Sequence, residues 1–262
     1  MAITAKSLVV APTSAADANA FIRRVHYSGK VVCNSQLHLG VFLDGRLEGA
    51  MQFGPSIDKR KIQGLVANTA WNGFIELNRL AFSERLPRNS ESRAISVAMR
   101  LFRRNYPHIE WVISFADATQ CGDGTIYRAS GFVLTAVRAN NALWIAPDGA
   151  SVIHELSTRT GKRAITTAVL NNGGASMKAY KELGYRQLAG FQLRYLYFLN
   201  PAARERLCEP VLPFAVIDKM GARMYRGKRP DELTRPKRAM AGVQPEQRGF
   251  DSYPDAPIDS AG

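Results

Sequence analysis

Two features of the sequence predict an α/β protein with a mixed central sheet flanked by helices and a basic C-terminal extension. The apolar, β-prone run 111–116 leads into a polar loop with Gly122 and Gly124, and then into a short helical pattern. Asp44-Gly45 separates the apolar runs 39–43 and 47–53, a pattern typical of an antiparallel hairpin. Strand–loop–helix and hairpin patterns in one chain indicate a mixed sheet, in which some strands are connected through helices and others through tight turns.

The other elements follow in chain order. A helix is expected from Ser14 to Val25, with Thr13 or Ser14 as its N-cap and its end near His26. Further predictions are an exposed irregular loop at 54–73, a strand at 74–82, a polar loop at 87–94, a helix at 95–102, a second hairpin from runs 133–137 and 142–145, a short apolar segment at 164–170 with a break at 171–174, a helix at 175–183 and a strand at 193–199.

Charge indicates the partner. The chain has 35 Lys and Arg against 22 Asp and Glu, a net charge of +13, so an anionic partner is expected. Double-stranded DNA is the leading candidate for this partner. A ribosome-associated or lipid-facing protein is the alternative. No apolar run approaches a membrane span and the N-terminus lacks a signal-peptide pattern, so we expect a soluble protein of the cytoplasm that makes no membrane contact.

Three regions are predicted. They are a catalytic domain at 1–221, a basic extension at 222–241 and a disordered tail at 242–262, whose composition is rich in Pro, Gly, Asp, Ser and Gln. The three cysteines, Cys33, Cys121 and Cys208, are far apart and lack CxxC spacing, which excludes a disulfide framework or zinc knuckle. Candidate phosphate contacts are Lys59, Arg60 and Lys61 in the loop and Arg223, Arg226, Lys228 and Arg229 in the extension, with a solvated charge run as the alternative for the loop.

Three side chains are candidates for chemistry, each with a structural alternative. Asp117 follows a buried strand, where α/β sheets place catalytic groups, but an Asp there can also cap the loop. His26 follows a helix and can serve as a C-terminal dipole partner. Alternation in 74–82 places Arg79 on the face of Ile75 and Leu77, opposite Glu76, and there it either forms a structural ion pair or lines a site.

The loop before the helix at 95–102 offers free backbone N–H groups to a phosphate, although Ser90 can instead be an N-cap. The order of elements resembles the GNAT acyltransferase fold, which implies an acyl-CoA or other anionic donor. Asn89-Ser-Glu-Ser92-Arg-Ala94 loosely matches the acyl-CoA loop of that fold, with Ser92 where the first glycine stands. The resemblance therefore implies cofactor contacts from Asn89, Ser92 and Ala94.

Four motifs together resemble the Mom family of Mu-like bacteriophages over residues 20–200. They are His26-Tyr27-Ser28, Glu76-Leu-Asn-Arg-Leu80, Ser114-Phe-Ala-Asp117 and Gly124-Thr-Ile-Tyr127. Mom proteins convert adenine in phage DNA to its carbamoylmethyl derivative and so block host restriction enzymes. The resemblance implies a site formed by His26, Tyr27, Arg79, Ser92, Asp117 and Tyr127, acting in the host cell cytoplasm.

The exocyclic amine of adenine is a poor nucleophile, so the reaction needs help. Asp117 or His26 can remove its proton, Tyr27 or Tyr127 can stack on the base or relay a proton, and Arg79 with Ser92 can hold an anionic donor, small or carrier-bound. Because a carbamoylmethyl group is attached through carbon, iron is a further candidate, with His26 and Asp117 as a partial ligand set. An ordinary GNAT acetyltransferase acting on protein or a small molecule, and a non-catalytic DNA-binding protein, are the alternatives.

Overall fold

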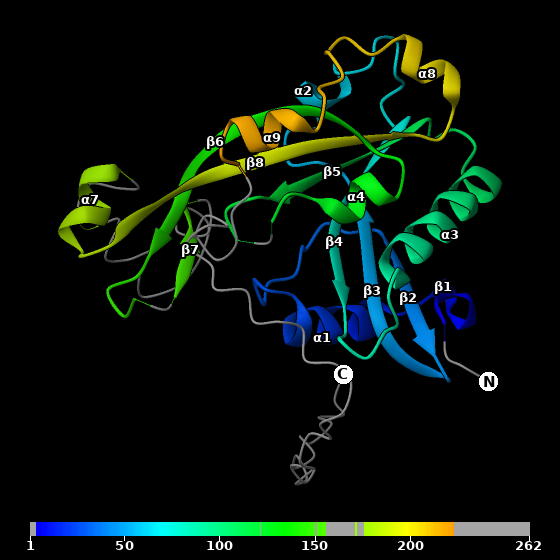
Figure 1. Cartoon of the computed structure of the whole chain (residues 1–262), viewed down its shortest axis with the longest axis horizontal. Coiled ribbons are helices and arrows are strands. Elements are labelled where there is room, and N and C mark those ends of the chain that lie inside the picture. Colours follow the sequence, from blue (N-terminus) through cyan, green and yellow to red (C-terminus); the bar gives the residue numbers. More distant parts are fainter. Residues whose placement is uncertain (1–3, 121, 150, 156–170, 172–175, 223–262) are drawn as a thin grey trace, which may run out of the picture.

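The computed structural model describes residues 4–120, 122–149, 151–155, 171 and 176–222. In this part of the chain one sheet has the strand order β1-β2-β3-β4-β5-β8-β6-β7, with the pair β4–β5 parallel and the other pairs antiparallel (Figure 1). The strands are β1 (Val9–Pro12), β2 (Leu37–Leu43), β3 (Arg46–Gly54), β4 (Phe74–Phe82), β5 (Trp111–Asp117), β6 (Val133–Ile145), β7 (Val152–His154) and β8 (Arg186–Phe198). The predicted mixed sheet with flanking helices is confirmed.

The helices of the described residues are the 3-10 helix η1 (Ala5–Ser7) and the α-helices α1 (Ala15–Val25), α2 (Lys59–Gln63), α3 (Ser90–Asn105), α4 (Thr125–Ala129), α7 (Met177–Glu182), α8 (Pro201–Glu205) and α9 (Ala215–Lys219). None of these helices combines the length and the apolar character that crossing a bilayer requires.

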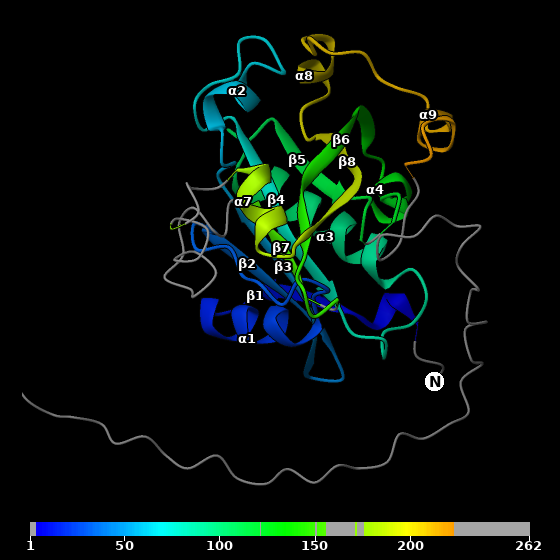
Figure 2. The same cartoon turned by 90° about the vertical axis from the view of Figure 1, so that its left-hand side faces the viewer.

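Helices α1 and α3 cover opposite faces of the sheet (Figures 1 and 2). The alternation of β3 explains this, because Ala50 packs with α1 whereas the next residue, Met51, belongs to the cluster that contains α3. Helix α1 begins as predicted, with the Ser14 hydroxyl accepting the N–H of Asp17, and ends at His26 as its C-cap. Its buried side chains are Ala18, Phe21 and Ile22.

Helix α3 is longer than the predicted 95–102 and begins at Ser90. Its N-cap is Asn89, which lies in the left-handed region at φ 68° and makes no side-chain cap. Ser90 is therefore not the N-cap, and its hydroxyl instead donates to the Pro87 carbonyl at 2.5 Å. The helix buries Ala94, Ile95, Ala98, Met99 and Phe102 against the sheet.

Two other expectations need correction. The runs 133–137 and 142–145 do not form a hairpin, because both belong to the continuous strand β6, whose pairing with β8 shifts register between Asn140 and Leu143. Asn140 accepts the N–H of Ala142 at 3.2 Å and so accommodates the irregularity within the strand. The segment 54–73 is not wholly irregular, because Asp58 caps α2. The predicted segments 164–170 and 172–174 lie outside the described residues.

Strands β4 and β5 diverge after a short paired stretch. Their parallel register covers Phe74–Glu76 against Trp111–Ile113, whereas β5 pairs with β8 from Trp111 to Asp117. At the closed end the rings of Phe74 and Trp111 stack with centroids 4.5 Å apart. The sheet therefore opens between β4 and β5 toward their carboxyl ends, as Figure 1 shows.

The loop after β5 is pressed against β8 at Gly190. A Cβ built on Gly190 would lie 1.9 Å from Thr119 Oγ1, so the close approach requires glycine at this position. Thr119 Oγ1 also accepts the N–H of Phe191 at 3.1 Å, and the N–H of Thr119 donates to Asp117 Oδ1 at 3.1 Å. This contact fixes the loop that holds Asp117.

We expect Gly190→Ala to destabilise the fold by about 1–3 kcal/mol, the usual cost of overpacking. The matched control is Gly64→Ala, because a Cβ on Gly64 would meet its nearest neighbour at an ordinary 3.5 Å. Denaturant unfolding of the two variants measures the difference. Equal stability of both variants would contradict the close approach.

Candidate active site

The opening between β4 and β5 is bridged by a buried hydroxyl. Ser114 Oγ of β5 lies 3.0 Å from the Leu77 carbonyl of β4 and 2.9 Å from the Tyr127 hydroxyl of α4. Tyr127 is 9% exposed and packs on Phe132 and Tyr195. Its ring is therefore part of the core, which does not favour the predicted stacking on a base, and its hydroxyl is hydrogen-bonded to Ser114.

Arg79 ties β4 to the loop that follows α1. Its Nε donates to the Lys30 carbonyl at 3.0 Å and its Nη1 to the Asn78 carbonyl at 2.8 Å. Burial lowers the pKa of Arg79, and Tyr27, Glu76 and Tyr127 oppose that shift. Arg79 thus has Glu76 in its electrostatic surroundings, although strict alternation places the two on opposite faces.

A β-bulge explains this correction. The register between β3 and β4 shifts between Gln52 and Phe53, with Gln52 opposite Arg79 and Phe53 opposite Leu77, so Asn78 is the extra residue. The loop after α1 packs here, because Ser35 donates to Asn78 Oδ1 at 3.1 Å. A bulge of this kind redirects the side chains that follow it, and here it accompanies the turn of Arg79 toward the opening.

His26 is neutral and oriented. Burial, and secondarily Arg79, lower its pKa from 6.5 to about 4. Nδ1 accepts the N–H of Ser28 at 3.2 Å and lies 2.9 Å from the Ser28 hydroxyl, which leaves the proton of the neutral ring on Nε2. In this state His26 presents a hydrogen-bond donor rather than a general base.

Tyr27 and Asp117 meet although they are far apart in sequence. The Tyr27 hydroxyl lies 3.5 Å from Asp117 Oδ2, and the Tyr27 ring lies 4.3 Å from that of His26 between centroids. Asp117 also accepts the side-chain N–H of Gln120 at 2.8 Å and the backbone N–H of Thr119. Tyr27 is 51% exposed and lies beside a carboxylate that two N–H groups hold.

Four residues near this cluster were given no role in the site from the sequence. Glu76 and the Lys30 carbonyl surround Arg79, Ser114 bridges the opening, and His154 of β7 lies within the electrostatic range of Asp117. Burial lowers the pKa of His154, Lys30 adds to the lowering, and Glu155 and Asp117 oppose it. The motif Glu76-Leu-Asn-Arg-Leu80 had marked β4, but no local pattern marks His154.

A second hollow lies at the start of α3. A cavity of about 310 Å³ is lined by the β4–α3 loop, including Asn89, by Ser92 in the first turn of α3, and by Thr125, Ile126 and Ala129 of α4. The Ser92 hydroxyl donates to the Asn89 carbonyl at 3.2 Å. Ala94, in contrast, is fully buried in the core, so its side chain does not line this hollow.

The basic residues of α2 lie at the other end of the strand pair. Lys59 Nζ donates to Asn72 at 3.0 Å and sits 4.6 Å from the Trp71 ring centroid, just before β4 begins. Asp117 ends β5, which runs parallel to β4, so α2 and Asp117 mark opposite ends. Arg60 and Lys61 are exposed, whereas Arg223, Arg226, Lys228 and Arg229 lie outside the described residues.

The candidate iron ligands His26 and Asp117 form a set of two. Among the described residues no group of three or more His, Cys, Asp or Glu side chains is arranged to hold a metal ion. Since Nδ1 of His26 is occupied by Ser28, any metal would have to take Nε2.

The fold and site define a mixed α/β protein whose polar cluster occupies the opening of a parallel strand pair. Solved structures similar to the chain are an acetyltransferase of Bacillus subtilis in complex with CoA and a GNAT family acetyltransferase of Elizabethkingia anophelis with acetyl-CoA bound. Each has a TM-score of 0.40 and 9% identity, over 73% of this chain and 97% or 98% of the other. At these values the likeness says nothing about what this chain binds.

The chain belongs to the Mom protein family, which it matches over residues 7–216. It is 38% identical over 203 residues to the protein named methylcarbamoylase mom of Escherichia phage Mu, covering 77% of this chain and 80% of that protein. The family resemblance expected from the four motifs is therefore confirmed.

We expect the pH dependence of folding to report the burial of His26. Its pKa is about 4 in the folded state against 6.5 as an ordinary value, so unfolding takes up a proton between these values. The stability that the neutral His26 contributes to the folded state is fully present above about pH 6.5 and is lost as the pH falls toward 4. The loss is no more than about 3 kcal/mol.

The unfolding free energies of the parent chain and of His26→Gln, measured from pH 7.5 to 4.5, test this expectation. The gap between the two chains should change with pH, because the variant lacks the titrating ring whereas His38 and His154 titrate in both. A gap that stays constant over this range would contradict the neutral, buried His26.

Proposed function

We propose that this chain is a DNA-modifying transferase that converts adenine in phage DNA to N(6)-carbamoylmethyladenine and so protects the DNA from host restriction. The observation that carries the proposal is membership of the Mom protein family, with a methylcarbamoylase as a relative at 38% identity. The meeting of Tyr27 and Asp117, 90 residues apart in sequence, beside the opening supports it.

Asp117 is the proposed general base toward the adenine amine. Its carboxylate is held by Thr119 and Gln120, and a positioned base is what proton removal during attack requires. His26 is less suited to that role, because its Nδ1 is engaged by Ser28 and the proton of its neutral ring is on Nε2. We assign it instead to donating a hydrogen bond from Nε2.

Tyr27 is the proposed stacking surface for the adenine. The amine is hidden in a duplex, so the base must leave the stack at a cost of a few kcal/mol, which aromatic stacking offsets in part. Tyr27 is exposed and Tyr127 is buried, which divides the two roles between them. The Tyr127 hydroxyl, linked to Ser114, then relays a proton within the opening.

The donor is proposed to be acyl-CoA or another anionic molecule, bound along the hollow at the start of α3. Backbone N–H groups at the N-terminus of a 16-residue helix favour an anion, and Arg79 adds a positive charge at the opening. Glu84 and Glu91 also line the hollow, so they set a limit on how much negative charge it accepts.

DNA itself is proposed to contact the basic residues. Arg60 and Lys61 on α2 are exposed, and the chain carries a net charge of +13. We further propose that residues 1–221 form the catalytic domain and that the extension 222–241 adds phosphate contacts.

We expect Asp117→Asn to reduce modified adenine at least about a hundredfold while DNA binding is retained, because general-base catalysis is typically worth 10²- to 10⁴-fold. Mass spectrometry of nucleosides from the DNA of cells expressing the chain measures the product. The matched control is Asp17→Asn in the first turn of α1, an exposed position.

Absence of any modified adenine with the parent chain would remove the proposed function. An acetyl-CoA assay without DNA would then separate an ordinary acetyltransferase from a non-catalytic DNA-binding protein. Modified adenine at the parental level in Asp117→Asn would return Asp117 to a loop-capping role.

We expect Ser92→Asp to abolish modification and leave the fold intact, because it places a carboxylate in the hollow proposed for the donor. Ser92→Ala is the matched control, since it removes the hydroxyl without adding charge. Nucleoside analysis together with a thermal unfolding curve checks both. Retained modification in Ser92→Asp would exclude the donor from this hollow.

A further inference from the structure

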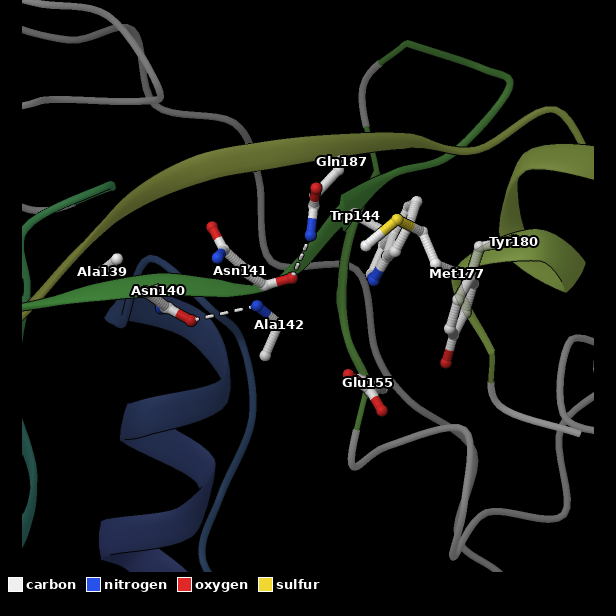
Figure 3. Close-up of a pocket in the computed structure, with 9 residues that line it drawn as sticks. All are labelled: Ala139, Asn140, Asn141, Ala142, Trp144, Glu155, Met177, Tyr180 and Gln187. Carbon is white, nitrogen blue, oxygen red and sulfur yellow. Dashed lines mark hydrogen bonds between the residues drawn. The ribbon is translucent and has the colours of Figure 1, made fainter.

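A cavity of about 460 Å³ lies on an arm of the sheet formed by β6, β7, the first half of β8 and α7. Figure 1 shows this arm extending away from α3 and β1. Figure 3 shows the residues that line the cavity: Ala139, Asn140, Asn141, Ala142, Trp144, Glu155, Met177, Tyr180 and Gln187. The volume lies in the range of small-molecule sites.

The wall of the cavity combines stacked aromatic rings with polar groups. Trp144 and Tyr180 stack with centroids 4.6 Å apart and an interplanar angle of 19°. Met177 is 53% exposed at the rim. Gln187 donates to the Asn141 carbonyl at 2.8 Å and so fixes one side of the rim. Rings, a thioether and amides together suit a planar, polar heterocycle.

The indole of Trp144 is a buried donor that lacks an acceptor. Trp144 is 2% exposed, and across the described part of the chain Nε1 finds no hydrogen-bond partner. Figure 3 shows this nitrogen on the side of the ring that faces Ala142 and Glu155. An unsatisfied buried donor destabilises the fold, and a ligand with an acceptor atom would remove that cost.

The strand register fixes the distance from the cavity to Asp117. Gln192 of β8 pairs with Asp117 on one side and with Arg138 on the other. Asn140 lies opposite Gly190, and Trp144 lies opposite Gln187. Ala139, the lining residue nearest to Asp117, lies opposite Phe191. At about 3.3 Å per residue, the cavity therefore runs from roughly 3 to 16 Å along β8 from the row of Asp117, with Trp144 at its far end.

The distance to Trp144 corresponds to about five base steps of duplex DNA at 3.4 Å each. A base that accepts the N–H of Trp144 is thus not the adenine that reacts at Asp117. It belongs to a different nucleotide of the same DNA.

We propose that the cavity binds a second, unstacked DNA base through a Watson–Crick edge on which an acceptor ring nitrogen lies beside an amine, as in adenine or cytosine, and so contributes to the choice of sequence. The Trp144 N–H donates to a ring nitrogen, and the Glu155 carboxylate accepts the neighbouring amine. A carboxylate has several acceptor sites, so Glu155 can keep its existing interaction and accept this one. On that edge guanine and thymine present a ring N–H toward the Trp144 N–H and a keto oxygen toward the carboxylate, and both are disfavoured. The inference rests on the proposed function for its DNA substrate.

The test follows the indole N–H resonances of the ¹⁵N-labelled full chain, which has three tryptophans. Trp144→Phe assigns the Trp144 resonance by its loss. The probes are short single-stranded oligonucleotides with one A, C, G or T among abasic sites, and one wholly abasic strand. We expect A and C to shift the Trp144 resonance at concentrations roughly tenfold below those for G and T, and the abasic strand to leave it in place.

Variants separate the parts of the site. Trp144→Phe keeps the aromatic stack, and we expect it to bind the A and C strands roughly threefold to tenfold more weakly, by fluorescence anisotropy. The side-chain amide of Glu155→Gln can donate to a keto group, so this variant should show a smaller preference for the A and C strands over the G and T strands. Trp71→Phe alters an exposed indole that precedes β4 and does not line the cavity. The base preference of this variant should match that of the parent chain.

Equal shifts with all strands, or none with any, would overturn the proposal. If free 2′-deoxyadenosine or 2′-deoxycytidine bound as tightly as the strands, the occupant of the cavity would be a small molecule rather than a base of DNA. The indole resonance reports binding without reaction, whereas nucleoside analysis reports the reaction. A base-dependent shift without modified adenine would therefore refute only the proposed function, and the reverse result only the inference.

Discussion

Where β4 and β5 stop pairing, their backbone groups lose their hydrogen-bond partners. The opening between the two strands depends on how these groups find new partners. Parallel pairing ends at Glu76 and Ile113, so the Leu77 carbonyl needs another donor close to the core. Ser114 supplies it and also lies within hydrogen-bond distance of Tyr127. The Ser114 hydroxyl thus bridges the two strands across the opening and connects them to α4. The candidate site around Arg79 and Asp117 is built on this gap.

The geometry also separates residues that the sequence treats as alike. Tyr27 and Tyr127 have the same chemistry, but one ring is half exposed and the other lies in the core. His26 and Asp117 are both conventional bases, but burial and Ser28 leave His26 a neutral donor, whereas Asp117 receives N–H groups. Function within the cluster is therefore assigned by environment rather than by residue type.

Local patterns predicted much of the fold, because capping, turn and apolar signals act over a few residues. Ser14 and Asp44-Gly45 are examples that the structure bears out. The signals failed where a long-range contact decides the outcome. The bulge at Asn78 turns Arg79, and pairing with β8 keeps Asn140 and Asn141 within β6. The motifs marked the cluster of His26, Tyr27 and Asp117 and included Ser114. The bridging contact of Ser114, the position of His154 and the cavity of Trp144 depend on strand neighbours that no local pattern reveals.

Strand β8 pairs with β5 on one side and β6 on the other, with Gln192 common to both registers. The stretch from Gln187 to Gln192 therefore cannot change length without consequence. Inserting one residue would move the arm by about 3.3 Å relative to Asp117 and exchange the faces on which its side chains lie. Loops elsewhere can absorb insertions during evolution, but relatives that keep both the arm and the site must keep this spacing, even where the residues themselves differ.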